Sequence, residues 1–79
     1  MEQIEELIGY IARNLVDDPD AVEVEAIDGD SAIVVELTVA KGDLGKVIGR
    51  EGRTARAIRT LLAAASARRQ RRAVLEILE

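Results

Sequence analysis

Residues 47–58 read VIGREGRTARAI, and this segment says more about the fold than any other part of the chain. Gly49 and Gly52 bracket a turn of two residues, and glycine permits the unusual dihedrals that a tight turn needs. Apolar residues recur at helical spacing on both sides of it, so the segment predicts a short helix, a turn and a longer helix. Many helix–turn–helix connections use glycine only to turn, and on the turn alone that interpretation stays open.

The turn also has features of an anion site. The second helix begins near Arg53, so its free N–H groups and the positive end of its dipole point toward the turn, an arrangement that attracts phosphate. Arg50 adds a guanidinium with five donors, and Arg56 and Arg59 continue a positive track along the helix. P-loop and dinucleotide motifs are excluded, because neither Gly-Lys-Ser/Thr nor G-x-G-x-x-G occurs.

The first half of the chain predicts one helix and a hairpin. Residues 4–15 follow the i, i+3, i+4, i+7 pattern of an amphipathic helix that ends at Asp17-Asp18-Pro19. Residues 22–26 and 33–39 alternate apolar and polar side chains like strands, and Asp28-Gly29 between them is a strong hairpin signal.

The second half predicts two helices and a strand. Helical spacing covers 44–48 and 55–65, and residues 75–77 alternate as a last strand. The order helix, strand, strand, short helix, helix, strand predicts one α+β domain over residues 1–79, with helices covering one face of a three-stranded sheet. The run 68–72 closes the longer helix, and its arginines are open to two interpretations: phosphate contacts, or complements to the negative end of that helix.

Composition excludes several functions. The chain of 79 residues has no cysteine and no histidine, which removes thiolate metal sites, disulfides and the commonest general base. With no paired-carboxylate site visible either, we expect no enzyme, no metal and no cofactor. Tyr10 is the only aromatic residue, which excludes aromatic stacking platforms, and we interpret it as a packing residue. The acidic N-terminus and the absence of a long apolar run predict a cytoplasmic protein without a signal peptide or membrane span.

The charges are distributed unevenly. The net charge is −4, yet residues 1–40 hold eleven acids and one base, whereas residues 41–79 hold ten bases and four acids. Such asymmetry hints at an anionic partner for the basic half. The alternative is a solvated surface whose two halves complement each other.

The segment from Val47 to Ile58 resembles the core motif of KH domains, V-I-G-x-x-G followed by an apolar helix. The element order α-β-β-α-α-β resembles the bacterial type II form of that domain. The size, the acidic first helix, the Asp17-Asp18-Pro19 break and the segments 45–49 and 57–62 also resemble the small bacterial single-KH proteins of the KhpA (YlqC) family. The likeness covers nearly the whole chain, which is identified as a member of that family.

The resemblance implies a non-enzymatic protein that binds single-stranded RNA, grips about four nucleotides with the GXXG loop, and serves as an RNA chaperone or regulator. It implies a homodimer, a heterodimer with a larger multi-domain KH protein (KhpB, also called Jag or EloR), or both. Ile48 and apolar residues of the neighbouring strand and helix would floor a groove for bases. The RNA-binding residues that the resemblance assigns are Lys46, Val47, Ile48, Gly49, Arg50, Glu51, Gly52, Arg53 and Arg56.

Glu51 departs from the family's pattern, in which a basic or polar pair occupies the middle of the loop. A carboxylate facing phosphates would weaken binding, whereas one turned toward the following helix would favour its N-terminus. Together with the acidic first half, Glu51 supports an alternative function: a degenerate KH domain that mediates protein interaction. In that case the alanine-rich helix of residues 53–67 would be the dimer face.

Overall fold

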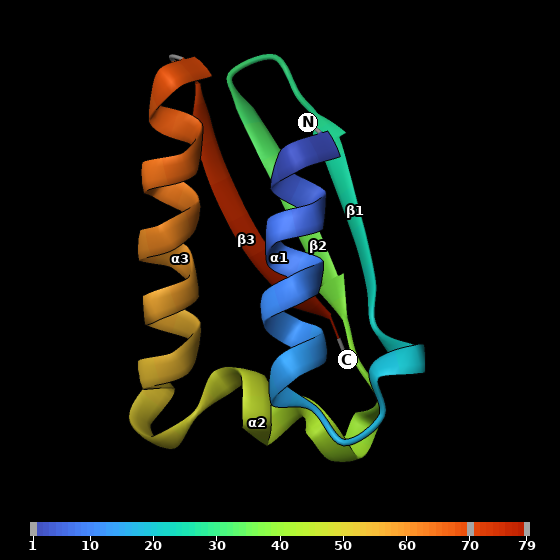
Figure 1. The fold of residues 1–79 in the computed structure, drawn as a ribbon. Helices are drawn as coiled ribbons and strands as arrows, with labels where there is room; N and C mark the ends of the chain where they lie inside the picture. The colour runs from blue at the N-terminus through green and yellow to red at the C-terminus, as the bar shows by residue number, and fades with distance from the viewer. Residues whose placement is uncertain (1, 70, 79) are drawn as a thin grey trace.

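A computed structural model describes residues 2–69 and 71–78 of the chain (Figure 1). Short 3-10 turns occupy residues 19–21, 41–43, 50–52 and 67–69. The helices and strands are α1 (Glu2–Leu15), β1 (Glu23–Asp28), β2 (Ala32–Thr38), α2 (Leu44–Ile48), α3 (Arg53–Ser66) and β3 (Arg72–Leu78). This order confirms the α-β-β-α-α-β arrangement that the hydrophobic pattern and the family resemblance predict.

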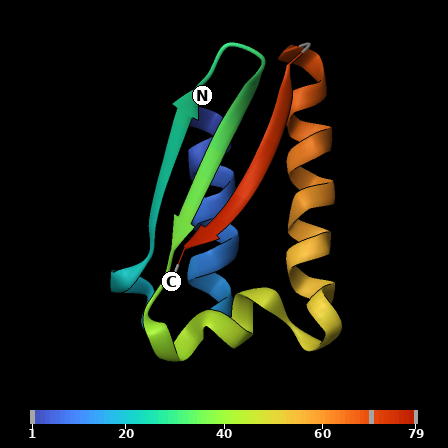
Figure 2. The same ribbon diagram turned by 180° about the vertical axis from the view of Figure 1, so that it is seen from behind.

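The three strands form one mixed sheet in the order β1-β2-β3. Strand β1 runs antiparallel to β2 through the hairpin, whereas β3 runs parallel to β2, with Val34 opposite Val74 and Leu37 opposite Ile77. A parallel pair needs a crossover connection, and the segment from α2 to α3 supplies it. Figure 1 shows α1 and α3 in front of the sheet, and Figure 2 shows the opposite face bare. The α+β fold of the type II KH domain is thus confirmed.

The core lies between the helices and the sheet. Strand β2 alternates between half-buried and buried residues along its whole length, and its buried side faces the helices. The helices contribute side chains at the spacing of one amphipathic face. The buried hydrophobic residues are Ile4, Ile8, Ala12, Val22, Ile33, Val35, Leu37, Val39, Val47, Ala55, Ile58, Leu62 and Leu75.

Two side chains differ from their sequence-based interpretations. Tyr10, which we expected to pack, is 69 % exposed, because it lies on the outer side of α1 rather than on the stripe that carries Ile4 and Ile8. Arg71 is bound to the β1–β2 hairpin, where its guanidinium donates to the Asp28 carboxylate and to the Gly29 carbonyl. It therefore ties the start of β3 to the hairpin, a role that neither interpretation of the arginine run included.

Candidate nucleic-acid interface

The loop between α2 and α3 has a backbone that ordinary residues adopt rarely. Gly49 has φ 77° and ψ 170°, and Gly52 lies in the left-handed region at φ 75° and ψ 13°. Glu51 has φ 57°, and among the described residues it is the only non-glycine residue with a positive φ. The left-handed conformation costs an L-residue roughly 1–2 kcal/mol. The loop therefore holds a strained glutamate between two glycines that carry no such cost.

The two glycines are needed for different reasons. A Cβ on Gly49 would lie 2.2 Å from the Thr54 Oγ1 atom and 2.8 Å from the Thr54 backbone nitrogen, so the start of α3 excludes any side chain there. A Cβ on Gly52 would meet nothing within 4 Å. Gly49 is thus required by the packing inside the loop, whereas Gly52 leaves open space at its surface, where another backbone can approach.

The start of α3 is open to an anion. Its N-cap residue is Gly52, and no side chain caps the helix. The positive end of the helix dipole therefore faces the loop without a bound carboxylate. Arg56 reaches back from the first turns of α3 and donates a hydrogen bond of 3.2 Å to the Glu51 carbonyl oxygen, which fixes the loop against the helix.

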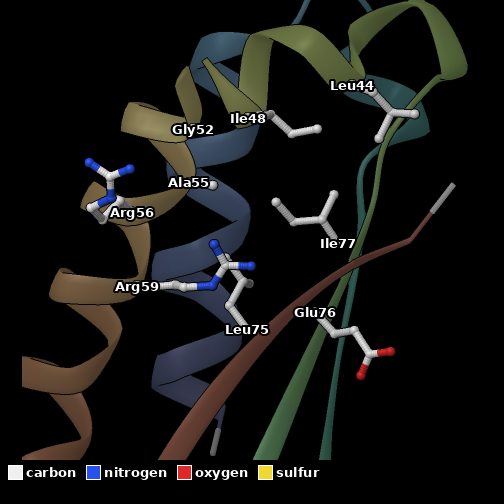
Figure 3. Close-up of a pocket in the computed structure, with 9 residues that line it drawn as sticks. All are labelled: Leu44, Ile48, Gly52, Ala55, Arg56, Arg59, Leu75, Glu76 and Ile77. Carbon is white, nitrogen blue, oxygen red and sulfur yellow. The ribbon is translucent and has the colours of Figure 1, made fainter. Parts of the chain in front are cut away.

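A groove of about 840 Å³ begins at this loop and runs between α2, α3 and β3. Figure 3 shows Leu44 and Ile48 of α2 on one side and Ile77 of β3 facing them, with Arg59 extending from α3 toward Leu75. Glu76 is also among the lining residues, and its side chain is directed away from the arginines. The remaining lining residues are Gly52, Ala55 and Arg56. The floor is apolar and one rim is positively charged.

The residues assigned by sequence occupy different positions around this groove. Ile48, which is 40 % exposed, lines it as expected, together with Gly52 and Arg56. The side chains of Arg50, Glu51 and Arg53 are exposed beside the loop. Val47 is fully buried in the core, so it holds α2 in place and offers no surface to a ligand.

Lys46 is engaged elsewhere. Its ammonium lies 3.3 Å from the Asp17 Oδ2 atom and 3.7 Å from the Asp43 Oδ1 atom, in a pair of ion pairs. Two thirds of the groove lining was absent from the sequence-based set: Leu44, Ala55, Arg59, Leu75, Glu76 and Ile77. Arg59 had a signal, because it continues the three-residue spacing of Arg53 and Arg56. The resemblance implied apolar residues from a neighbouring strand, but no sequence pattern identifies them as Leu75 and Ile77, because only the crossover brings β3 beside α3.

Within residues 2–69 and 71–78, no group of three or more Asp or Glu side chains is placed to hold a metal ion. Over the same residues, no helix is long and apolar enough to cross a membrane.

The fold, with its glycine loop between two helices and a groove beside it, defines a KH domain of type II. A family model described as the KH domain of KhpA/KhpB matches residues 5–77. The chain therefore belongs to the KhpA/KhpB family, as its sequence motifs indicate. It is 53 % identical over 73 residues to RNA-binding protein KhpA of Caldanaerobacter subterraneus, covering 92 % of this chain and 97 % of the relative.

Other relatives agree. RNA-binding protein KhpA of Chlamydia trachomatis is 50 % identical over 76 residues, covering 96 % of this chain and 97 % of the relative. The protein of the same name from Aquifex aeolicus is 46 % identical over 79 residues, and the match covers both chains completely. Among solved structures, Aquifex aeolicus Era Y63A bound to GDP·AlF4− matches with a TM-score of 0.66 and 20 % identity. That match covers 95 % of this chain and 29 % of the Era chain, and it supports the fold alone.

Proposed function

We propose that this protein binds single-stranded RNA without catalysing a reaction, and that it acts as an RNA chaperone or post-transcriptional regulator. One observation carries the proposal: an apolar groove begins directly at the glycine loop and is rimmed by arginines. A nucleic acid is the polymer that needs a phosphate site and an apolar base site next to each other. The name of the relatives, RNA-binding protein KhpA, supports the same ligand.

In this proposal the loop holds the RNA backbone, and the groove receives the bases. The open surface at Gly52 admits the sugar-phosphate chain, and Arg50, Arg53 and Arg56 meet its phosphates. The KH loop spans about four nucleotides. Aliphatic side chains line the groove, so bases pack against them without aromatic stacking. Sequence preference is therefore weak, and affinity falls steeply with salt because phosphate contacts release counterions.

The test is a single substitution, Gly52→Asp. It places a carboxylate where the RNA backbone is proposed to approach, and aspartate tolerates the left-handed backbone better than most residues. Gly49→Asp is a poorer test, because its Cβ would collide with Thr54 and distort the loop itself. Gly42→Asp is the matched control, since a Cβ there also meets open space and its backbone needs no positive φ.

We expect Gly52→Asp to lower RNA affinity by at least about a hundredfold in fluorescence anisotropy, while Gly42→Asp stays within about twofold of the wild type. Circular dichroism should give the same helical content for all three proteins. Equal RNA affinity of the wild type and a folded Gly52→Asp protein would refute the assignment of the loop.

A second function concerns protein partners. We propose that the outer face of α3 forms a homodimer, or pairs with a larger multi-domain KH protein of the KhpB (Jag, EloR) type. Leu61 is 49 % exposed on that face, and Ala57 and Ala64 lie exposed one turn to either side of it. Small residues beside one large apolar residue let two helices approach closely.

Sedimentation equilibrium separates the two functions. Leu61→Glu should shift the protein toward a monomer, because it buries a charge at the interface. Leu15→Glu is the control, since Leu15 is another exposed leucine, 38 % exposed at the end of α1. A tight wild-type dimer that binds no RNA at low salt would favour the interaction module over the RNA-binding protein, and a monomeric wild type would refute the dimer.

A further inference from the structure

A buried carboxylate joins the end of α1 to the start of α2. Asp43 immediately precedes α2, and its side chain is 5 % exposed. Its Oδ1 accepts a hydrogen bond of 3.2 Å from the Asp17 backbone N–H, and its Oδ2 accepts one of 3.1 Å from the Asp18 backbone N–H. Those two N–H groups lie where the chain leaves α1 and bends toward Pro19, so no continuing helix can satisfy them.

Lys46 balances this carboxylate. It lies three residues after Asp43 on α2, and its ammonium pairs with both Asp43 and Asp17. The Lys46 side chain is 43 % exposed, so the ammonium bridges the two carboxylates at the surface while Asp43 itself is buried. A buried carboxylate is tolerated when it is hydrogen-bonded and paired, and here the joint supplies both.

The joint lies next to the glycine loop. Helix α2 is five residues long, too short to be stable alone, and Gly49 follows its last residue directly. The far side of the loop is fixed by α3, through the hydrogen bond from Arg56 to the Glu51 carbonyl. On the near side of the loop, the Asp43 carboxylate ties the N-terminus of α2 to the end of α1. Figure 1 shows that the segment after α1 passes beside the segment that leads into α2.

We propose that Asp43 is a positioning residue for RNA binding, and that Lys46 is its counter-ion rather than a ligand of the RNA backbone. The inference rests on the proposed RNA-binding function. By fixing α2, Asp43 holds the glycine loop in the geometry that accepts the backbone before RNA arrives. A loop ordered in advance loses less conformational entropy on binding, so its affinity is higher.

The first experiment measures the loop without RNA. Amide hydrogen exchange is compared in the wild type, Asp43→Asn and Ile33→Val. Asparagine offers one carbonyl oxygen, so one of the two backbone N–H groups loses its acceptor and Lys46 loses a paired charge. We expect exchange in Asp43→Asn to accelerate over residues 44–52 and to stay slow in the β1–β2 hairpin. Ile33→Val trims a core residue in β2 next to the hairpin, and its exchange should change without singling out residues 44–52.

The second experiment measures binding of a fluorescently labelled, mixed-sequence oligoribonucleotide at several salt concentrations. Asp43→Asn should bind roughly tenfold more weakly, with an unchanged slope of log affinity against log salt, because no phosphate contact is lost. Lys46→Met should also weaken binding slightly and leave the slope unchanged. Arg53→Met should make the slope shallower by about 0.7, the value for one phosphate contact on a single strand.

Each outcome bears on the proposal. A slope for Lys46→Met as shallow as that of Arg53→Met would make Lys46 a phosphate ligand and overturn its counter-ion role. Wild-type affinity and wild-type exchange in a folded Asp43→Asn protein would overturn the positioning role.

If Asp43→Asn does not fold, Lys46→Met carries the exchange test. Faster exchange over residues 44–52 is still expected in that variant, and unchanged exchange refutes the joint. If the wild type binds no RNA, the proposed function fails, and the exchange data alone decide whether Asp43 orders the loop.

Discussion

Strand β3 separates two surfaces of opposite charge. On its helix side lies the groove, with Arg56 and Arg59 at the rim. On the bare face of the sheet the strand register aligns Glu25 with Glu36, and Glu36 with Glu76, in one row across all three strands. The net charge of −4 hides this arrangement. A local positive surface binds an anion even on an acidic protein, since interactions beyond about 10 Å are screened at ordinary salt.

The two surfaces also differ in how their charges are held. Among the described residues, none of the ion pairs involves the glutamate row, and like charges directly opposite one another in a sheet are destabilising. At the groove, Arg56 is fixed to the Glu51 carbonyl, while the arginines around it stay exposed. The comparison places the positive charge at the proposed RNA site and the negative row on the opposite, bare face of the sheet.

The largest expected effect comes from matched pairs of neutralising substitutions on the two surfaces. Arg56→Gln with Arg59→Gln should weaken RNA binding by about a hundredfold, since each charged hydrogen bond contributes roughly 1.5–3 kcal/mol. Glu25→Gln with Glu36→Gln removes two charges from the bare face and should change affinity by less than about twofold. Fluorescence anisotropy with a short single-stranded RNA measures both. Equal and opposite changes for the two pairs would mean that net charge, and not the groove, determines binding.

The elements of this fold were predictable because their signals are local. The amphipathic spacing of residues 4–15 predicts a helix and the alternation of residues 33–39 predicts a strand. Each pattern depends only on the element itself and on its one buried face, and both predictions are confirmed. The loop glycines were predictable for the same reason. The groove was predictable only in part: three of its nine lining residues were assigned from the sequence, and Leu75 and Ile77 reach it through a parallel strand whose neighbour the periodicity does not specify.

Polar contacts between distant residues left no trace in the pattern. Lys41-Gly42-Asp43 indicates only the end of a strand. Asp43 is nevertheless buried, and its carboxylate accepts hydrogen bonds from the backbone of Asp17 and Asp18, which precede it by 26 and 25 positions. Arg71 binds Asp28 and Gly29 across 43 and 42 residues, although a run of arginines suggests solvent or phosphate. A charged side chain is interpreted as exposed by default, and only the tertiary structure shows which ones are not.

An intermediate effect is expected at Glu51, the one acidic side chain in the loop of the positive surface. Glu51→Lys removes a repulsion and adds an attraction, so RNA affinity should rise about fivefold and the salt slope should steepen by about 0.7. Glu51→Gln is the control that removes the charge alone, and it should give a smaller rise with little change of slope. Unchanged affinity in both variants would show that the Glu51 carboxylate is turned away from the bound backbone.

The smallest expected effect concerns the middle of the glutamate row. Glu36 has a glutamate opposite it on both neighbouring strands, so Glu36→Gln should stabilise the fold by a few tenths of a kcal/mol, or about 2 °C in Tm. Glu23→Gln is the control, because its partner across the strand is the uncharged Thr38. Thermal unfolding followed by circular dichroism should show a gain for Glu36→Gln that shrinks at high salt, as screening removes the repulsion. A loss of stability at both salt concentrations would instead mean that Glu36 makes a favourable contact on the bare face. Repulsion between the aligned glutamates would then not be the dominant effect at this position.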